Sequence, residues 1–153
     1  MTPSIITFCM TCLITCNVYA GFVESQEQKE VKTFRQAYHG FLEANRYLKK
    51  ITSQPAETSA SGVELGSVSK KESNTYIKML ADTLNQANSV SDAVLAKIHP
   101  ELPKAYRSIF IASLENKLHG WRDSDPEASL KGTLLHNQWI DWWNAHYKKF
   151  AKL

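Results

Sequence analysis

The first 20 residues of this 153-residue chain contain no Asp, Glu, Lys, Arg or His, and the first charged residue is Glu24. The segment is apolar, but threonines and an asparagine interrupt it, so it is weaker than the roughly 20 strongly apolar residues that a membrane span needs. It ends in Val18-Tyr19-Ala20, which places short side chains at the −3 and −1 positions of a signal-peptide cleavage site. We therefore predict a secretory signal peptide over residues 1–20.

Two alternatives to a cleaved signal peptide stay open. The segment lacks the Lys or Arg that usually precedes the apolar region of a signal peptide, which leaves a retained membrane anchor as one alternative. Leu13-Ile14-Thr15-Cys16 resembles a bacterial lipobox, although Thr15 stands where Gly, Ala or Ser is usual. If Cys16 were lipidated, the protein would be tethered to a membrane by its N-terminus.

Cysteine is absent from the rest of the chain. The only three cysteines are Cys9, Cys12 and Cys16, and all lie in the predicted leader. The mature domain, predicted over residues 21–153, would have neither a disulfide nor a thiol nucleophile. A domain of this length can bury an adequate apolar core without such cross-links.

The sequence also lacks the motifs of catalysis, cofactor binding and nucleic-acid recognition. Its formal net charge is only +3, and acidic and basic residues are interspersed, so nucleic-acid binding is not expected. No glycine-flanked Ser, Gly-rich phosphate loop or His-Glu-x-x-His motif occurs, and no two histidines have the i, i+3 or i, i+4 spacing of a helical zinc site. We therefore predict no cofactor, no metal site and no catalytic residue. Four histidines are interpreted as structural or solvated: His39, His99, His119 and His136.

No segment alternates in the manner of a β-strand, whereas helical spacing recurs along the chain. A first helix is predicted over 24–51, in which Gly40 would let a neighbouring helix approach closely. Asn45 would either set the register of the packing as a polar residue or, as we favour, lie at a partly exposed edge. Residues 53–73 are rich in Ser, Thr, Gly and Ala and are predicted to form a flexible loop. The apolar face of the first helix combines Val31, Phe34, Tyr38, Phe41, Asn45 and Leu48.

Capping residues and prolines indicate where the later helices begin and end. A second helix is predicted after an N-cap at Ser73 or Asn74, and a short helix over 91–98. A further helix should begin near Pro103 and end with Gly120 as its C-cap.

The last predicted helix covers about 125–150 and follows a capping box formed by Ser124 and Glu127. The composition, 43% hydrophobic and 22% charged, is that of a globular domain. The fold class that we predict is all-α: a small helical bundle of four main helices plus a short helix, after an N-terminal signal peptide.

The segment with the most candidate binding residues is HNQWIDWWNAHYKKF, at residues 136–150. At 100° per residue its large apolar and aromatic side chains fall within an arc of roughly 140°. This arc is interpreted either as an aromatic binding face with a titratable histidine, or as a buried core face with a hydrogen-bonded histidine. The candidate binding residues are Trp139, Trp142, Trp143, His146 and Tyr147.

The two interpretations differ in which aromatic side chains of this helix should be buried and which exposed. We expect Trp139 and Trp142 to be mainly buried against the first helix, at its Phe34, Tyr38 and Phe41 face, and against the helix that begins near Pro103. His146 should lie among them and hold a single polar partner. Trp143 and Tyr147 should lie at the exposed edge of the arc, where they would be available for contact.

Three functions are considered. The leading hypothesis is an exported, non-catalytic protein that acts by protein–protein interaction, as a binder, inhibitor or immunity-type partner of another exported or envelope protein. The alternative is a small-molecule carrier that holds an apolar or aromatic ligand between helices. The third is an enzyme with an unrecognised acid/base pair, which would need a concave site with two polar residues of separated proton affinities.

Overall fold

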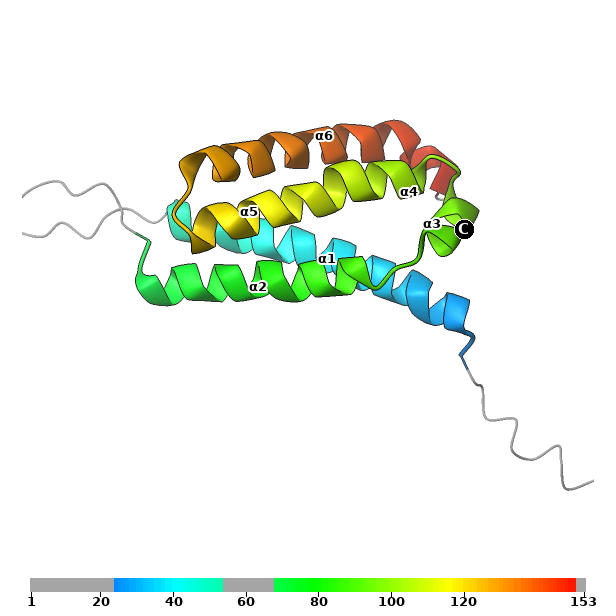
Figure 1. Cartoon of the computed structure of the whole chain (residues 1–153), viewed down its shortest axis with the longest axis horizontal. Helices are drawn as coiled ribbons and strands as arrows, with labels where there is room; N and C mark the ends of the chain where they lie inside the picture. The colour runs from blue at the N-terminus through cyan, green and yellow to red at the C-terminus, as the bar shows by residue number, and fades with distance from the viewer. Residues whose placement is uncertain (1–23, 54–67, 151–153) are drawn as a thin grey trace, which may run out of the picture.

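The computed structural model describes residues 24–53 and 68–150, with side chains as far as His146 in the last helix, and this part of the chain is helical apart from short connections (Figure 1). The predicted all-α fold is confirmed for these residues. The predicted leader at 1–20 and most of the predicted loop at 53–73 lie outside them. The helices are α1 (Gln26–Thr52), α2 (Lys70–Asn88), α3 (Asp92–Ile98), α4 (Leu102–Ala105), the π-helix η1 (Tyr106–Ile111), α5 (Ala112–Arg122) and α6 (Pro126–Phe150).

The long helices associate in two close pairs. α1 packs against α2, α5 packs against α6, and α2 also contacts α5. Figure 1 shows these helices lying alongside one another, with the short α3 at the same end as the C-terminal part of α6. None of the described helices is long and apolar enough to cross a bilayer.

Aromatic rings fill the interior between the two pairs. Phe41 meets Phe110 with 5.0 Å between ring centroids, and Tyr106 stacks on Phe110, also at 5.0 Å. Both Phe41 and Phe110 are completely buried. Large aromatic side chains bury 150–250 Å² each, so these rings dominate the apolar surface removed from water. The largest fully buried side chains are Trp139, Tyr76, Tyr106, Phe41, Phe110, Leu80, Leu95, Leu102 and Leu114.

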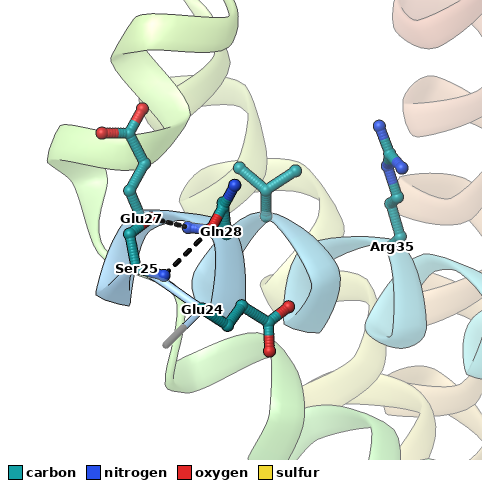
Figure 2. Close-up of a pocket in the computed structure, with 6 residues that line it drawn as sticks. Glu24, Ser25, Glu27, Gln28 and Arg35 are labelled. Carbon is teal, nitrogen blue, oxygen red and sulfur yellow. Dashed lines mark hydrogen bonds between the residues drawn. The ribbon is translucent and has the colours of Figure 1, made fainter. Parts of the chain in front are cut away.

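Serine residues are the N-caps of α1 and α2, and the N-cap of α2 differs from the predicted one. Ser25 and Gln28 form a capping box at the start of α1, where each side chain accepts a hydrogen bond from the other residue's backbone N–H (Figure 2). Ser69 and Glu72 form the same motif at the start of α2. The prediction of an N-cap at Ser73 or Asn74 is therefore wrong, and the predicted loop is shorter at its C-terminal end.

The turn between α5 and α6 also differs from the prediction. α5 continues through Gly120, which is buried against Ser129, and ends at Arg122. Asp125 caps α6, because its Oδ1 accepts from the backbone N–H groups of residues 127 and 128 at 2.9 and 3.1 Å. Ser124 has a φ of 56° and forms the left-handed corner of the turn, so the predicted Ser124 capping box is wrong.

Two other expectations for the helices are settled by the packing. A Cβ atom at Gly40 would lie 2.7 Å from Oγ1 of Thr83, so the predicted close approach of a neighbouring helix is confirmed. Asn45 is half-buried, in agreement with the predicted partly exposed position, and its Oδ1 accepts a hydrogen bond from Lys117.

The helix predicted to begin near Pro103 runs continuously from α4 through η1 into α5. The π-helical segment η1 forms the middle of this continuous helix. Such segments interrupt the regular i→i−4 ladder and are frequent at functional sites. Here the segment buries Tyr106, Phe110 and Ile111 while Ser108 stays exposed and Ile109 half-exposed.

Candidate functional site

Trp139 is the buried centre of the C-terminal aromatic cluster. It has no exposed surface, as predicted, and its ring lies 4.9 Å from that of Phe110 and 6.2 Å from that of Tyr106. These ring contacts are with η1, so the expected burial of Trp139 against the helix predicted to begin near Pro103 is confirmed. The indole N–H finds no hydrogen-bond acceptor among the residues that the structure describes. Trp139 is a core residue that supports the neighbouring tryptophans.

Trp143 contacts the aromatic face of α1. Its ring stacks on Tyr38 at 4.8 Å and lies 6.1 Å from Phe34. Burial raises the pKa of the Tyr38 phenol. The expectation that Trp143 lies at the exposed edge is wrong, because this half-buried ring joins α6 to α1. Tyr147 was also expected to be an exposed contact residue, and its side chain lies outside the part of the chain that the structure describes.

Trp142 points to the other side of α6, toward the connection between α3 and α4. It was expected to be buried against the first helix and the helix that begins near Pro103; its half-buried ring stacks on Trp139 at 5.5 Å and on His146 at 4.3 Å, and it lines a groove with residues of α4 and η1. His99 meets its edge at 6.3 Å. The tryptophan that stacks on the aromatic face of α1 is Trp143.

His146 has two polar partners instead of the predicted single one. Its Nδ1 lies 2.7 Å from the backbone oxygen of Trp142, and its Nε2 lies 3.4 Å from a carboxylate oxygen of Glu101. The ring of His99 lies edge-on at 5.4 Å. His99, interpreted from the sequence as structural or solvated, is half-buried here. Residues far apart in the sequence thus form one group of two imidazoles, one indole and one carboxylate.

A surface groove adjoins this group. It has a volume of about 540 Å³ and lies between the start of the α4–η1–α5 helix and α6. Apolar carbon comes from Trp142, Ile109 and Ala105, whereas Glu101, Lys104 and Ser108 supply polar groups. We call this feature the Trp142 groove; its lining is Pro100, Glu101, Lys104, Ala105, Ser108, Ile109 and Trp142.

Two other hollows have a different character. The hollow at the start of α1, of about 680 Å³, is lined mainly by charged and polar groups, with Val31 as its apolar residue (Figure 2). A shallow groove of about 600 Å³ beside α1 and α2 is lined by Lys32, Arg35, Gln36, His39, Gly40 and Gln86. Neither contains a Phe, Tyr or Trp side chain that could anchor a partner.

The described residues contain no group of three His, Cys, Asp or Glu side chains that could hold a metal ion. The Trp142 groove combines part of an indole ring, short apolar side chains and one charge of each sign, so it can offer apolar, hydrogen-bonding and ionic contacts.

No protein-family model, curated protein or solved structure matches this chain.

Proposed function

We propose that this chain is an exported, non-catalytic four-helix-bundle protein that binds another exported or envelope protein through the Trp142 groove. Export is proposed from the charge-free segment at residues 1–20 and its Val18-Tyr19-Ala20 ending. Membrane attachment enters the proposal only through the alternative in which Cys16 is lipidated.

The observation that carries the proposal is the position of Trp142 in the groove. Its ring is backed by Trp139 on one side and by His146 on the other, so the indole is held in a fixed orientation. Rigid aromatic side chains give large contact area at low cost in conformational entropy, and tryptophan is enriched among residues that dominate binding energies. Trp142 is therefore the proposed anchor for the partner.

The polar rim supports a protein partner. Lys104 and Ser108 are exposed beside the apolar part of the groove, and Glu101 reaches back to His146. An apolar centre with a polar rim is the usual anatomy of a protein interface. A partner that fits would place an apolar or aromatic side chain against the part of Trp142 that lines the groove, with an acidic group close to Lys104.

The packing around Trp139 weighs against the carrier hypothesis at this site. Its ring has neighbours at 4.9 to 6.2 Å from η1 and α6, so ring-on-ring contacts fill the space beside it. A carrier would need room between the helices for an apolar ligand. The enzyme hypothesis would need two polar groups of separated proton affinities in the groove.

The experiment is a pull-down of the full chain from the exported fraction of its source cells, compared with a variant in which the groove is blocked. Ser108→Arg places a long side chain in the groove without removing a core contact, because Ser108 is exposed. Gln138→Arg is the matched control, since it makes an equivalent change at an exposed position of α6 that does not line the groove.

The proposal predicts that one exported protein is recovered by the native chain and by Gln138→Arg but not by Ser108→Arg. Direct binding measurements with that protein should then show an affinity loss of about tenfold or more for Ser108→Arg, equivalent to about 1.4 kcal/mol. Equal recovery by both variants would refute the assignment of the groove. Recovery of a small molecule that co-purifies with the native chain and is lost from Ser108→Arg would favour the carrier instead.

A further inference from the structure

A buried lysine lies away from the Trp142 groove. Lys117 on α5 is only 5% exposed. Its Nζ donates to Oδ1 of Asn45 on α1 at 2.6 Å and lies 3.5 Å from Nδ1 of His136 on α6. We call Lys117, Asn45 and His136 the lysine cluster. It joins three helices through a single ammonium group.

The charge of this ammonium has no opposite charge beside it. Over residues 24–53 and 68–146, no carboxylate lies within 4.0 Å of Lys117. Burial alone lowers the pKa of Lys117 to about 8. Burial, followed by the charge of Lys117, lowers the pKa of His136 to about 4, so this imidazole is neutral at pH 7. The cluster therefore holds one buried positive charge at neutral pH.

The hydrogen-bonding capacity of the ammonium is also not fully used. A lysine ammonium has three N–H donors, and the described residues offer it one short bond, to Asn45, and one long contact, to His136. The ring of Phe41 lies 5.8 Å from Nζ and can only contribute a weak cation–π interaction. Buried cations are normally paired, because an unpaired charge in an apolar environment is costly.

The surroundings of the cluster are apolar and partly accessible. Asn45 and His136 are half-buried rather than enclosed. One helical turn from them, on the same helix faces, lie the half-buried side chains of Leu42, Leu48 and Ile140. A ligand that reached the ammonium would therefore meet hydrocarbon next to the charge.

We propose that the lysine cluster is a binding site for the carboxylate of a small organic acid with an apolar tail, which enters between α1 and α6. The carboxylate takes the free donor capacity of Lys117 and supplies the missing negative charge. Asn45 holds the ammonium in place, because its own Nδ2 is fixed by a 2.7 Å hydrogen bond to the backbone oxygen of Phe41. His136, neutral and half-exposed, covers the cluster from α6.

The test uses sodium octanoate as the probe and the full chain, with binding followed by calorimetry and by NMR of the lysine side chains. Octanoate should bind saturably at about pH 6.5, and at about pH 9.5 the affinity should be at least tenfold lower, because Lys117 has then lost its proton. Octan-1-ol, which has the same tail without the charge, should bind more weakly and with no such pH dependence. Bound octanoate should also raise the pKa of Lys117.

Lys117→Met keeps an unbranched side chain that is only one heavy atom shorter and removes the charge, and it should abolish octanoate binding. Lys131→Met, at an exposed position of α6, is the matched control and should bind as the native chain does. If the native chain does not bind octanoate, or if Lys117→Met binds it equally well, the site is refuted. If Lys117→Met does not fold, the test is the pH dependence of octanoate binding to the native chain. An octanoate affinity that is the same at both pH values would overturn the proposal.

Discussion

The indole ring of Trp143 stacks on the phenol ring of Tyr38, with 4.8 Å between the centroids and 26° between the planes. This contact connects the last helix to the first. The neighbouring residue, Trp142, points away from α1 and lines a surface groove. Trp143 thus packs the last helix against the first, whereas Trp142, in our proposal, binds the partner.

Trp139→Ala should be among the most destabilising single changes in the chain. The side chain is completely buried between η1 and its neighbours on α6, and replacing a buried Trp by Ala costs about 3–5 kcal/mol. Urea unfolding followed by circular dichroism measures this loss. Leu134→Ala is the control, because Leu134 is 55% exposed and its truncation should change the free energy of unfolding by about 0.5 kcal/mol or less. Comparable losses for both variants would contradict the described packing of α6.

Gly132→Ala should force α5 and α6 apart. A Cβ atom at this position would lie 2.7 Å from the backbone nitrogen of Lys117 and 3.1 Å from the backbone oxygen of Ser113. Backbone atoms cannot move aside as a side chain can, so we expect a net loss of about 1–3 kcal/mol despite the better helix propensity of Ala. Thermal melting of Gly132→Ala and of the exposed control Thr133→Ala tests this. A gain in melting temperature for Gly132→Ala would show that the two helices are not this close.

The cap of α6 should make part of the stability dependent on acid. The pKa of Asp125 is lowered from 3.8, chiefly by the hydrogen bond from the backbone N–H of Ala128. A carboxyl group whose pKa is lower in the folded state adds stability above pH 3.8 and loses it as the pH falls through the lower value. Asp125→Asn keeps the acceptor oxygen but cannot titrate.

The native chain should therefore melt at a higher temperature than Asp125→Asn at about pH 6, and the difference should disappear near pH 2. Melting curves of both proteins across this range measure the effect. A difference that does not change with pH would mean that the carboxylate charge plays no part in the cap.

Lys117 should give the opposite kind of pH dependence, in the alkaline range. Its pKa is about 8 in the folded chain against 10.5 when it is exposed, so the unfolded chain binds more protons between these values. Stability relative to Lys117→Met should consequently rise as the pH increases from 8 to 10.5, by about 3 kcal/mol in total, and stay flat below 8. Chemical denaturation at several pH values gives this difference. A native chain that loses stability relative to Lys117→Met over the same range would refute the burial of the ammonium.

Much of the fold is predictable from local sequence. The 3-4 spacing of apolar residues locates α1, and His99-Pro100 ends α3 where predicted, because a residue before proline avoids helical backbone. The errors come from ambiguous caps. Ser69 lies in a serine-rich segment with several possible N-caps, and Ser124 precedes an Asp that competes with it for the same role. Tertiary packing decides between such neighbours, and a single sequence does not contain that information in readable form.

The site is less predictable because its parts meet only in three dimensions. Helical periodicity places Trp139 at the centre of the arc, and it is buried. The pattern cannot say which flank of α6 faces α1, so it does not indicate that Trp143 is the residue that stacks on Tyr38. Glu101 and His99 reach His146 from a distant connection, and no spacing rule links them. Lys117 looks like any other helical lysine until its neighbours are known.

The most direct test of the proposed function compares Trp142→Ala with Trp143→Ala for affinity toward the partner recovered with the native chain. Trp143→Ala removes the contact with Tyr38, so it should lower the melting temperature and leave the affinity of the folded fraction nearly unchanged. Trp142→Ala should raise the Kd for the partner more than fivefold, equivalent to a loss of about 1 kcal/mol or more. Unchanged affinity for Trp142→Ala, or a larger loss for Trp143→Ala, would contradict the account.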